Sequence, residues 1–378
     1  MENKKNMVVI LLLILVLLIV ACIVVSKVIK DKQNNIISHL QTSEKIDVVP
    51  TFLEKISTNS AWCGTFQLVW NDMQNEVVGQ DIIFNPQISI VENLNKQSFK
   101  ESDLSEEYYY KIWGMKTLEL KDKIEKGIED KFNQKSDIID LLDWSDVPKN
   151  DSGYSADYKE YLFYTMLYRE FNFEKVFSVL DKEKFKGLEK TFEDIEYFGI
   201  DKNTDESVYG QVKVLFYNSK EDFAVILNTK EGDQVLLAKG NNGSTFEEIY
   251  DNVRKKQKNY SGNSYFTEND TLKVPKIKLD VLREYKELEN NVFKAKNGNA
   301  CEISKALQTI KFELDEKGGK IKSEAVIDMK ETAAIGDFEK PEKRFFNFDS
   351  TYSIFLLEDG KELPYFAANI DDISLYQD

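Results

Sequence analysis

The chain has 378 residues, of which 42% are hydrophobic and 12% are aromatic, enough for a large buried core. Its net charge of −16 argues against nucleic acid as a partner, because phosphate binding needs a basic surface. The single histidine, His39, argues against a histidine-dependent hydrolase and a His-rich metal site, so we expect no enzyme, no metal and no cofactor.

The N-terminal region contains an apolar run without a charge, residues 7–25, which is long enough to span a bilayer. We expect residues 1–32 to form a signal-anchor at the cell membrane, a single transmembrane helix with the body of the chain outside the cytoplasm. An alternative is a lipoprotein, since residues 19–22 also read as a lipobox that would make Cys22 a lipidated N-terminus.

The polar residues 33–57 are expected to be a stalk, followed by a single folded body over residues 58–378. From Asn59 a helical pattern places five apolar side chains on one face: Trp62, Phe66, Val69, Trp70 and Met73. Residues 81–90 read as a short strand broken by Pro86, and residues 120–132 as an amphipathic helix.

Further strands are expected along the rest of the body, with one more helix, capped by Ser244 or Thr245, at residues 245–253. The expected strands are 112–118, 161–168, 192–197, 208–217, 223–227 and 271–279, and residues 138–144 form a strand or a short helix. Asp359-Gly360 predicts a hairpin between 352–357 and 363–366. Strands outnumber helices and are scattered, which predicts an α+β fold with large antiparallel sheets.

The segment 310–328 has the most regular pattern, with apolar and polar residues alternating on both sides of Gly318-Gly319. Alternation of period two across a glycine turn predicts a β-hairpin with one buried face. One face of the second arm carries small or apolar residues: Gly319, Ile321, Ser323, Ala325 and Ile327.

Two cysteines lie in the body, Cys63 and Cys301. They could form a disulfide bond outside the cell, but two buried thiols are the commoner outcome and the one we expect.

Several segments, taken in order, resemble the serpin family of protease inhibitors over most of residues 58–372. Residues 303–306 and 315–318 resemble the serpin sequence ahead of the reactive loop, and 274–279 its Leu-Pro-Lys-Phe strand. Residues 211–227 are similar to a serpin strand pair, 346–356 to the C-terminal core strand, and Phe173 replaces a serpin tryptophan. The resemblance implies a serpin-like α+β fold with surrounding helices and an exposed reactive loop at about residues 318–345. It also shows departures, since too little chain is left for the usual helices between 89 and 112 and between 144 and 161.

The resemblance implies an extracellular serine-type endopeptidase inhibitor, a monomer whose partner is a serine or cysteine protease. In the family the protease cuts the loop, and the hinge then inserts into a sheet and traps the protease as a covalent acyl-enzyme. The hinge would be Gly318, Gly319, Ile321, Ser323, Ala325 and Ile327. The cut would fall at Thr332-Ala333, or alternatively at Lys330. Because Ile321 is bulky for a hinge, the alternative is a non-inhibitory surface protein of this fold that binds a partner.

Overall fold

The computed structural model describes residues 45–155, 158–240, 242–322 and 343–377 of the chain. The anchor expected at residues 7–25, with Cys22, lies outside these residues. Among the residues that are described, no helix is both long and apolar enough to cross a membrane.

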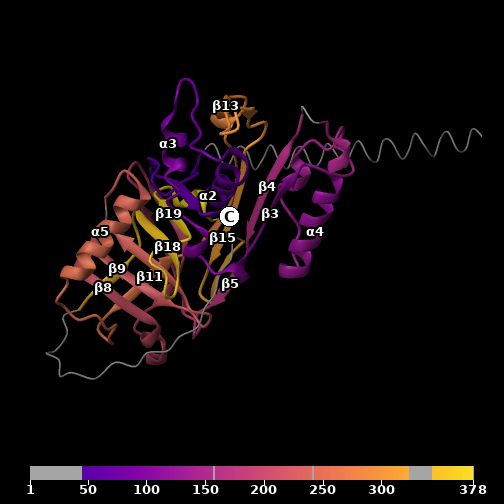
Figure 1. Cartoon of the computed structure of the whole chain (residues 1–378). Coiled ribbons are helices and arrows are strands. Elements are labelled where there is room, and N and C mark those ends of the chain that lie inside the picture. Colours follow the sequence, from indigo (N-terminus) through magenta and orange to yellow (C-terminus); the bar gives the residue numbers. More distant parts are fainter. Residues whose placement is uncertain (1–44, 156–157, 241, 323–342, 378) are drawn as a thin grey trace, which may run out of the picture.

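The largest element is a seven-stranded sheet in the order β1–β2–β19–β18–β10–β9–β8 (Figure 1). Its strands are β1 (Asp47–Val49), β2 (Ser60–Cys63), β8 (Val212–Ser219), β9 (Asp222–Asn228), β10 (Asp233–Lys239), β18 (Tyr352–Glu358) and β19 (Phe366–Ile370). All neighbours are antiparallel except β1 and β2. Every residue of β18 is buried, which its central position explains.

Two four-stranded sheets accompany it. The first has the order β17–β11–β7–β6, with β6 (Ser178–Lys186), β7 (Thr191–Ile200), β11 (Thr271–Pro275) and β17 (Phe345–Asn347). The second has the order β12–β15–β16–β5, with β5 (Arg169–Asn172), β12 (Ile277–Glu284), β15 (Leu307–Leu314) and β16 (Gly318–Ile321). The second packs on the seven-stranded sheet, where the ring centroids of Phe312 and Phe366 are 4.7 Å apart.

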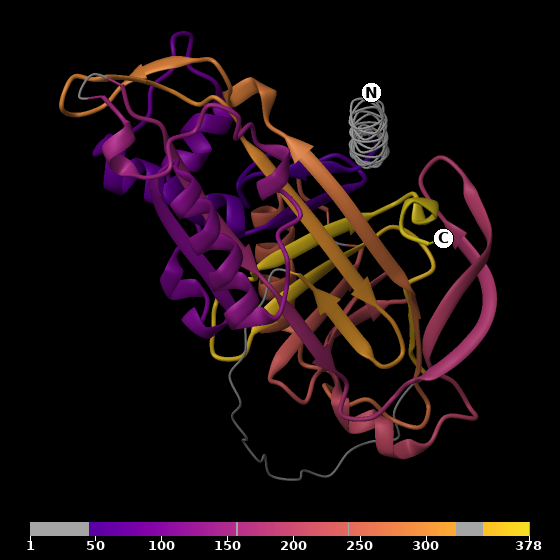
Figure 2. The same ribbon diagram turned by 90° about the vertical axis from the view of Figure 1, so that its right-hand side faces the viewer.

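Two strand pairs and four helices complete the described part of the chain. The pairs are β3 (Tyr109–Met115) with β4 (Tyr161–Leu167), and β13 (Val292–Lys294) with β14 (Ala300–Glu302). The helices are α2 (Thr65–Asp72), continued by a π-helical turn over Met73–Val78, α3 (Ser89–Asn95), α4 (Leu118–Phe132) and α5 (Phe246–Asn259). Figure 2 shows α4 lying along β3 and β4.

Local chemistry explains where the two longest helices begin and what they bury. The Thr117 hydroxyl caps α4 by accepting from the backbone N–H of Leu120, and Thr245 caps α5 in the same way through Glu248. Leu120, Ile124 and Ile128, spaced by four residues, are buried together with Tyr164 and Met166 of β4.

The expected α+β class with large antiparallel sheets is confirmed, and four local expectations are wrong. Trp62 lies in β2, so the first helix begins only at Thr65. Residues 81–90 form no strand; Asn85-Pro86 is a cis bond, and α3 begins at Ser89. Residues 45–57 are not a stalk, since Val48, Val49 and Phe52 belong to the core and β1 pairs with β2. Residues 271–279 form two strands in different sheets, divided after Pro275.

No disulfide bond joins Cys63 to Cys301, as expected, but only one of the two thiols is buried. Cys63 is buried in β2 and Cys301 is half-buried in β14.

Candidate functional site

The strand that follows the glycine pair is already seated in a sheet. β16 lies between β15 and β5 and is antiparallel to both, with Ile321 opposite Phe312 on one side and Arg169 on the other. The ladder reaches one residue further, where the backbone N–H of Lys322 donates to Lys311 O at 3.2 Å. Ile321 is fully buried, so this face of the strand belongs to the core.

The turn before β16 is made by an aspartate rather than by the two glycines. The Asp315 carboxylate accepts from the backbone N–H of Lys317 at 2.8 Å, and Gly318 and Gly319 then begin the strand. The glycines are needed for close approach to β5. A Cβ on Gly318 would lie 2.1 Å from Phe171 O, and a Cβ on Gly319 would lie 2.4 Å from the Phe171 ring.

Replacing Gly318 by alanine therefore forces β16 away from β5, because the atom that its new Cβ meets is backbone and cannot rotate aside. We expect a loss of about 1–3 kcal/mol in the free energy of unfolding, the usual cost of overpacking. Urea denaturation measures it, with Gly210→Ala as the control, since a Cβ there meets nothing within 4 Å. Equal stability of the two variants would contradict this seating of β16.

An ion pair with β5 stabilises the outer face of β16. Lys320 Nζ lies 2.7 Å from Glu170 Oε1 of β5 and 5.2 Å from the centroid of the Tyr168 ring. The hydrogen bond to Glu170 raises the pKa of Lys320, and the same bond lowers the pKa of Glu170. Lys320 thus points outward and Ile321 inward, as the alternation predicts.

Beyond β16 the sheet is open. The N-terminal half of β15, residues 307–311, pairs with β12 on one side only, apart from the bond to Lys322. β4 pairs with β3, and no described strand pairs with its other edge. A cavity of about 1070 Å³ lies between these two edges and is lined by residues of both. We call this space the slot, bounded by residues 161–167 and 307–311.

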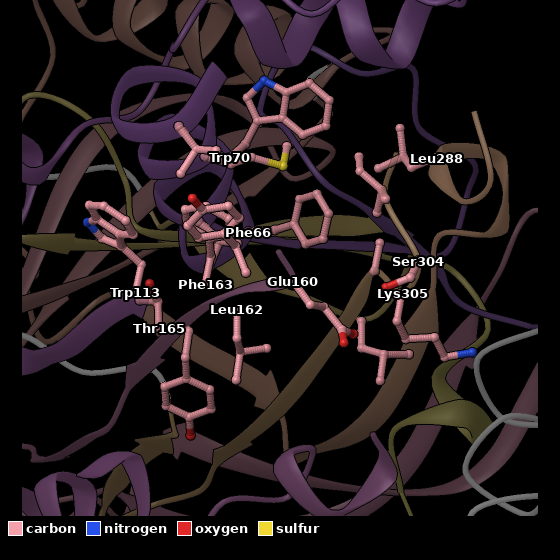
Figure 3. Close-up of a pocket in the computed structure, with 18 of the residues that line it drawn as sticks. Phe66, Trp70, Trp113, Glu160, Leu162, Phe163, Thr165, Leu288, Ser304 and Lys305 are labelled. Atoms are coloured by element: carbon pink, nitrogen blue, oxygen red, sulfur yellow. The ribbon is translucent and has the colours of Figure 1, made fainter. Parts of the chain in front are cut away.

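Figure 3 shows Leu162, Phe163 and Thr165 on one side of the slot and Ser304 and Lys305 on the other. Helix α2 contributes Phe66 and Trp70 to the lining, and Trp113 of β3 stacks on Phe163 with centroids 5.9 Å apart. The Thr165 hydroxyl is buried with no hydrogen-bond partner among the described residues. A cavity with both apolar and polar walls between two unpaired strand edges is suited to an extended segment with alternating side chains.

A buried ion pair underlies the strand next to the slot. Arg169 Nε of β5 donates to Asp233 Oδ2 of β10 at 2.5 Å, and the Tyr365 hydroxyl donates to Asp233 Oδ1 at 3.0 Å. The side chains of Arg169 and Asp233 are 4% and 0% exposed. The pair links the β12–β15–β16–β5 sheet to the seven-stranded sheet through Arg169, the residue opposite Ile321 in β5.

Chain segment 323–342 leads from β16 to β17, which lies in a different sheet and pairs with β11. Arg344 anchors the start of β17 by donating to Asp270 Oδ2 at 2.8 Å, and its side chain is 7% exposed. The two strands to which the segment is attached, β16 and β17, are therefore each held by pairing within a sheet.

Part of the expected hinge lies inside the sheet and not outside it as the sequence analysis predicted. We expected an exposed loop from about residue 318, with residues 319–327 outside the sheet at rest. Gly318–Ile321 instead pair with β5, and all but the first also with β15, so that expectation is wrong for these four residues. Their close approach to Phe171 and the burial of Ile321 are the physical reason. Ser323, Ala325, Ile327, Lys330, Thr332 and Ala333 lie outside the described residues.

The sequence reading missed the slot itself, and with it Thr165, Trp113 and the Arg169–Asp233 pair. One signal was available. Residues 161–168 are apolar on both faces, which is typical of a central strand, and yet β4 is paired on one edge only.

Comparison with known proteins finds no matching family model and no matching curated protein. Similar solved structures include Serpin48 of the insect Tenebrio molitor, with 13% identity and a TM-score of 0.37, covering 71% of this chain and 78% of that one. Human thyroxine-binding globulin has 11% identity and a TM-score of 0.44, covering 83% and 92%. The thermophilic serpin tengpin has 14% identity and a TM-score of 0.40, covering 68% and 64%. Likenesses this distant concern the fold alone.

Proposed function

We propose that this chain is a serpin-type protease inhibitor that traps its target by inserting a cleaved loop into the slot. The observation that carries the proposal is the position of β16, which ends at the mouth of a cavity with an unpaired strand edge on each side. A strand that continued β16 in its present register would pair with both edges. Such a strand is supplied by the segment that follows β16 in the chain, whose residues Ser323, Ala325 and Ile327 keep the small or apolar alternation.

The chain supplies no acid or base to the reaction, since the protease brings its own. The protease attacks a carbonyl in the segment, at Thr332-Ala333 or at Lys330, and forms an acyl-enzyme. Cutting the bond frees the upstream arm from β17, and the arm can then extend β16 into the slot. The protease, still bonded to the arm, is carried along the sheet before water can release it.

The proposal includes a place of action outside the cytoplasm, at the cell surface, where the protein works as a monomer. This part rests on the sequence, in which the uncharged run of residues 7–25 precedes the folded body. Cys22 remains the lipid attachment site in the lipoprotein alternative.

One observation favours the second candidate, a non-inhibitory surface protein of this fold that binds a partner. Gly318–Ile321 are already inserted, so part of the free energy of insertion has been released before any cut. The free energy that is left to drive insertion after a cut is then smaller, and insertion is slower. If insertion is slower than hydrolysis of the acyl-enzyme, the protein is only cleaved as a substrate.

Denaturing gels after incubation with proteases separate the two candidates. We expect an SDS-stable adduct with at least one protease among a subtilisin-like, an elastase-like and a trypsin-like enzyme. In a variant with Thr332→Arg, adduct formation should shift toward the trypsin-like enzyme. Complete cleavage by all three enzymes without any adduct would leave the non-inhibitory candidate.

A further inference from the structure

A short loop after α4, residues 133–139, spans the mouth of the slot. On one side the Ser136 hydroxyl lies 3.2 Å from the Tyr164 hydroxyl of β4. On the other side Asp137 reaches the strand pair, with Oδ1 3.5 Å from Lys311 Nζ of β15 and Oδ2 3.1 Å from Lys322 Nζ at the end of β16. The loop therefore contacts both edges of the slot at the point where the described part of the inserted strand ends.

The loop is itself held in shape. The Ser136 hydroxyl accepts from the backbone N–H groups of Ile138 and Ile139 at 3.3 and 3.0 Å, which closes a tight turn around Asp137. Lys322 Nζ also donates to Lys135 O at 2.7 Å. Asp137 is thus presented to the two lysines from a defined backbone position.

We propose that Asp137 is a positioning residue that fixes the register of β16 at the mouth of the slot. Lys311 and Lys322 are ladder neighbours, and their ammonium groups repel each other unless a carboxylate lies between them. A slip of β16 by one residue would turn Lys322 to the opposite face of the sheet. A slip by two residues would bring one of the two lysines to the place of the other and leave either Asp137 or Glu170 without a lysine.

The two ion pairs therefore fix the pairing register of β16, and the pair made by Asp137 is the one nearer to the slot. The role of Asp137 rests on the proposed function, in which β16 is extended into the slot. A strand that entered the slot one residue out of register would bury charges and expose Ile321. The effect of Asp137 on the register of β16 can nevertheless be tested without any protease.

Hydrogen–deuterium exchange of the uncleaved full chain is the test. In Asp137→Ala we expect the backbone amides of Lys320, Ile321 and Lys322 to exchange about fivefold faster, the change expected when one partly exposed carboxylate with two partners is lost. The amides of β18 should not change, and Asp137→Glu should restore most of the protection. The control is Asp140→Asn, just beyond the loop, because Asp140 Oδ1 lies 2.9 Å from Lys121 Nζ of α4.

Unchanged exchange at residues 320–322 in Asp137→Ala would overturn the inference, as would an equal change in Asp140→Asn. Faster exchange in β18 as well would mean general destabilisation and would count against a positioning role. If exchange changes as expected and no protease forms an adduct, the positioning role holds and the proposed function fails. If adducts form and exchange is unchanged, the reverse is true.

Discussion

Cutting the chain once between residues 323 and 342 is expected to raise its melting temperature by about 6 °C. The freed arm can extend β16 along the unpaired edges of residues 161–167 and 307–311, adding about six residues to the middle of a sheet. A six-residue strand between two edges forms about ten ladder hydrogen bonds of about 1 kcal/mol each, and the inward-facing Ala325 and Ile327 together contribute about 3 kcal/mol. Backbone ordering costs about 1.5 kcal/mol per residue, about 9 kcal/mol in all. The net gain is about 4 kcal/mol, and because the entropy of unfolding is about 2.1 cal/mol/K per residue, each kcal/mol corresponds to about 1.5 °C in a chain of this size.

The experiment compares the intact chain with a chain nicked by a small amount of a subtilisin-like protease, with the nick confirmed by mass spectrometry. The control is Ala325→Pro, nicked in the same way. Proline lacks the N–H that a central strand must donate, so the nicked variant should gain little. A wild-type gain below about 2 °C after complete nicking would mean that the slot does not accept the arm.

The pattern of residues 310–328 predicted the strands β15 and β16 of this site but not the slot beside them. The alternation placed Ile310, Phe312 and Leu314 in the core, and all three are buried. It also gave Lys320 and Ile321 opposite faces, because side chains of a strand alternate whatever sheet they join. The hairpin that the alternation predicts is confirmed for residues 318–321, since β16 pairs antiparallel with β15. Alternation does not reveal the second partner of a strand, and the structure places β16 between β15 and β5.

The slot could not be read from the sequence for a related reason. Its edges lie about 140 residues apart in the chain, in residues 161–167 and 307–311, and each looks like an ordinary strand. Whether two such strands meet depends on how the whole sheet packs on α2 and on the seven-stranded sheet. Residues 45–57 were misread in the same way, since their few apolar residues, Ile46, Val48, Val49 and Phe52, are spaced too irregularly to indicate burial.

The Arg169–Asp233 pair matters to this arrangement because it joins β5, the strand beside the inserted hinge, to β10 of the other sheet. Arg169 also lies over the Tyr108 ring, 4.8 Å from its centroid, and Nη2 donates to Glu231 O at 3.2 Å. With both side chains almost fully buried, neither charge has water to replace a lost partner. The pair therefore holds β5 against β10 beside the slot.

We accordingly expect Asp233→Ala to lower the free energy of unfolding by about 3–5 kcal/mol, because it leaves the Arg169 guanidinium buried without a counter-charge. The double variant Arg169→Met/Asp233→Asn should recover at least half of this loss, since it removes the uncompensated charge together with its partner. Asp130→Ala is the control, as its ion pair with Lys126 lies on the surface of α4, and no measurable change is expected. Urea denaturation of the four proteins measures the effect. A loss in the double variant as large as in Asp233→Ala would show that shape at this position, and not the buried charge, holds β5 to β10.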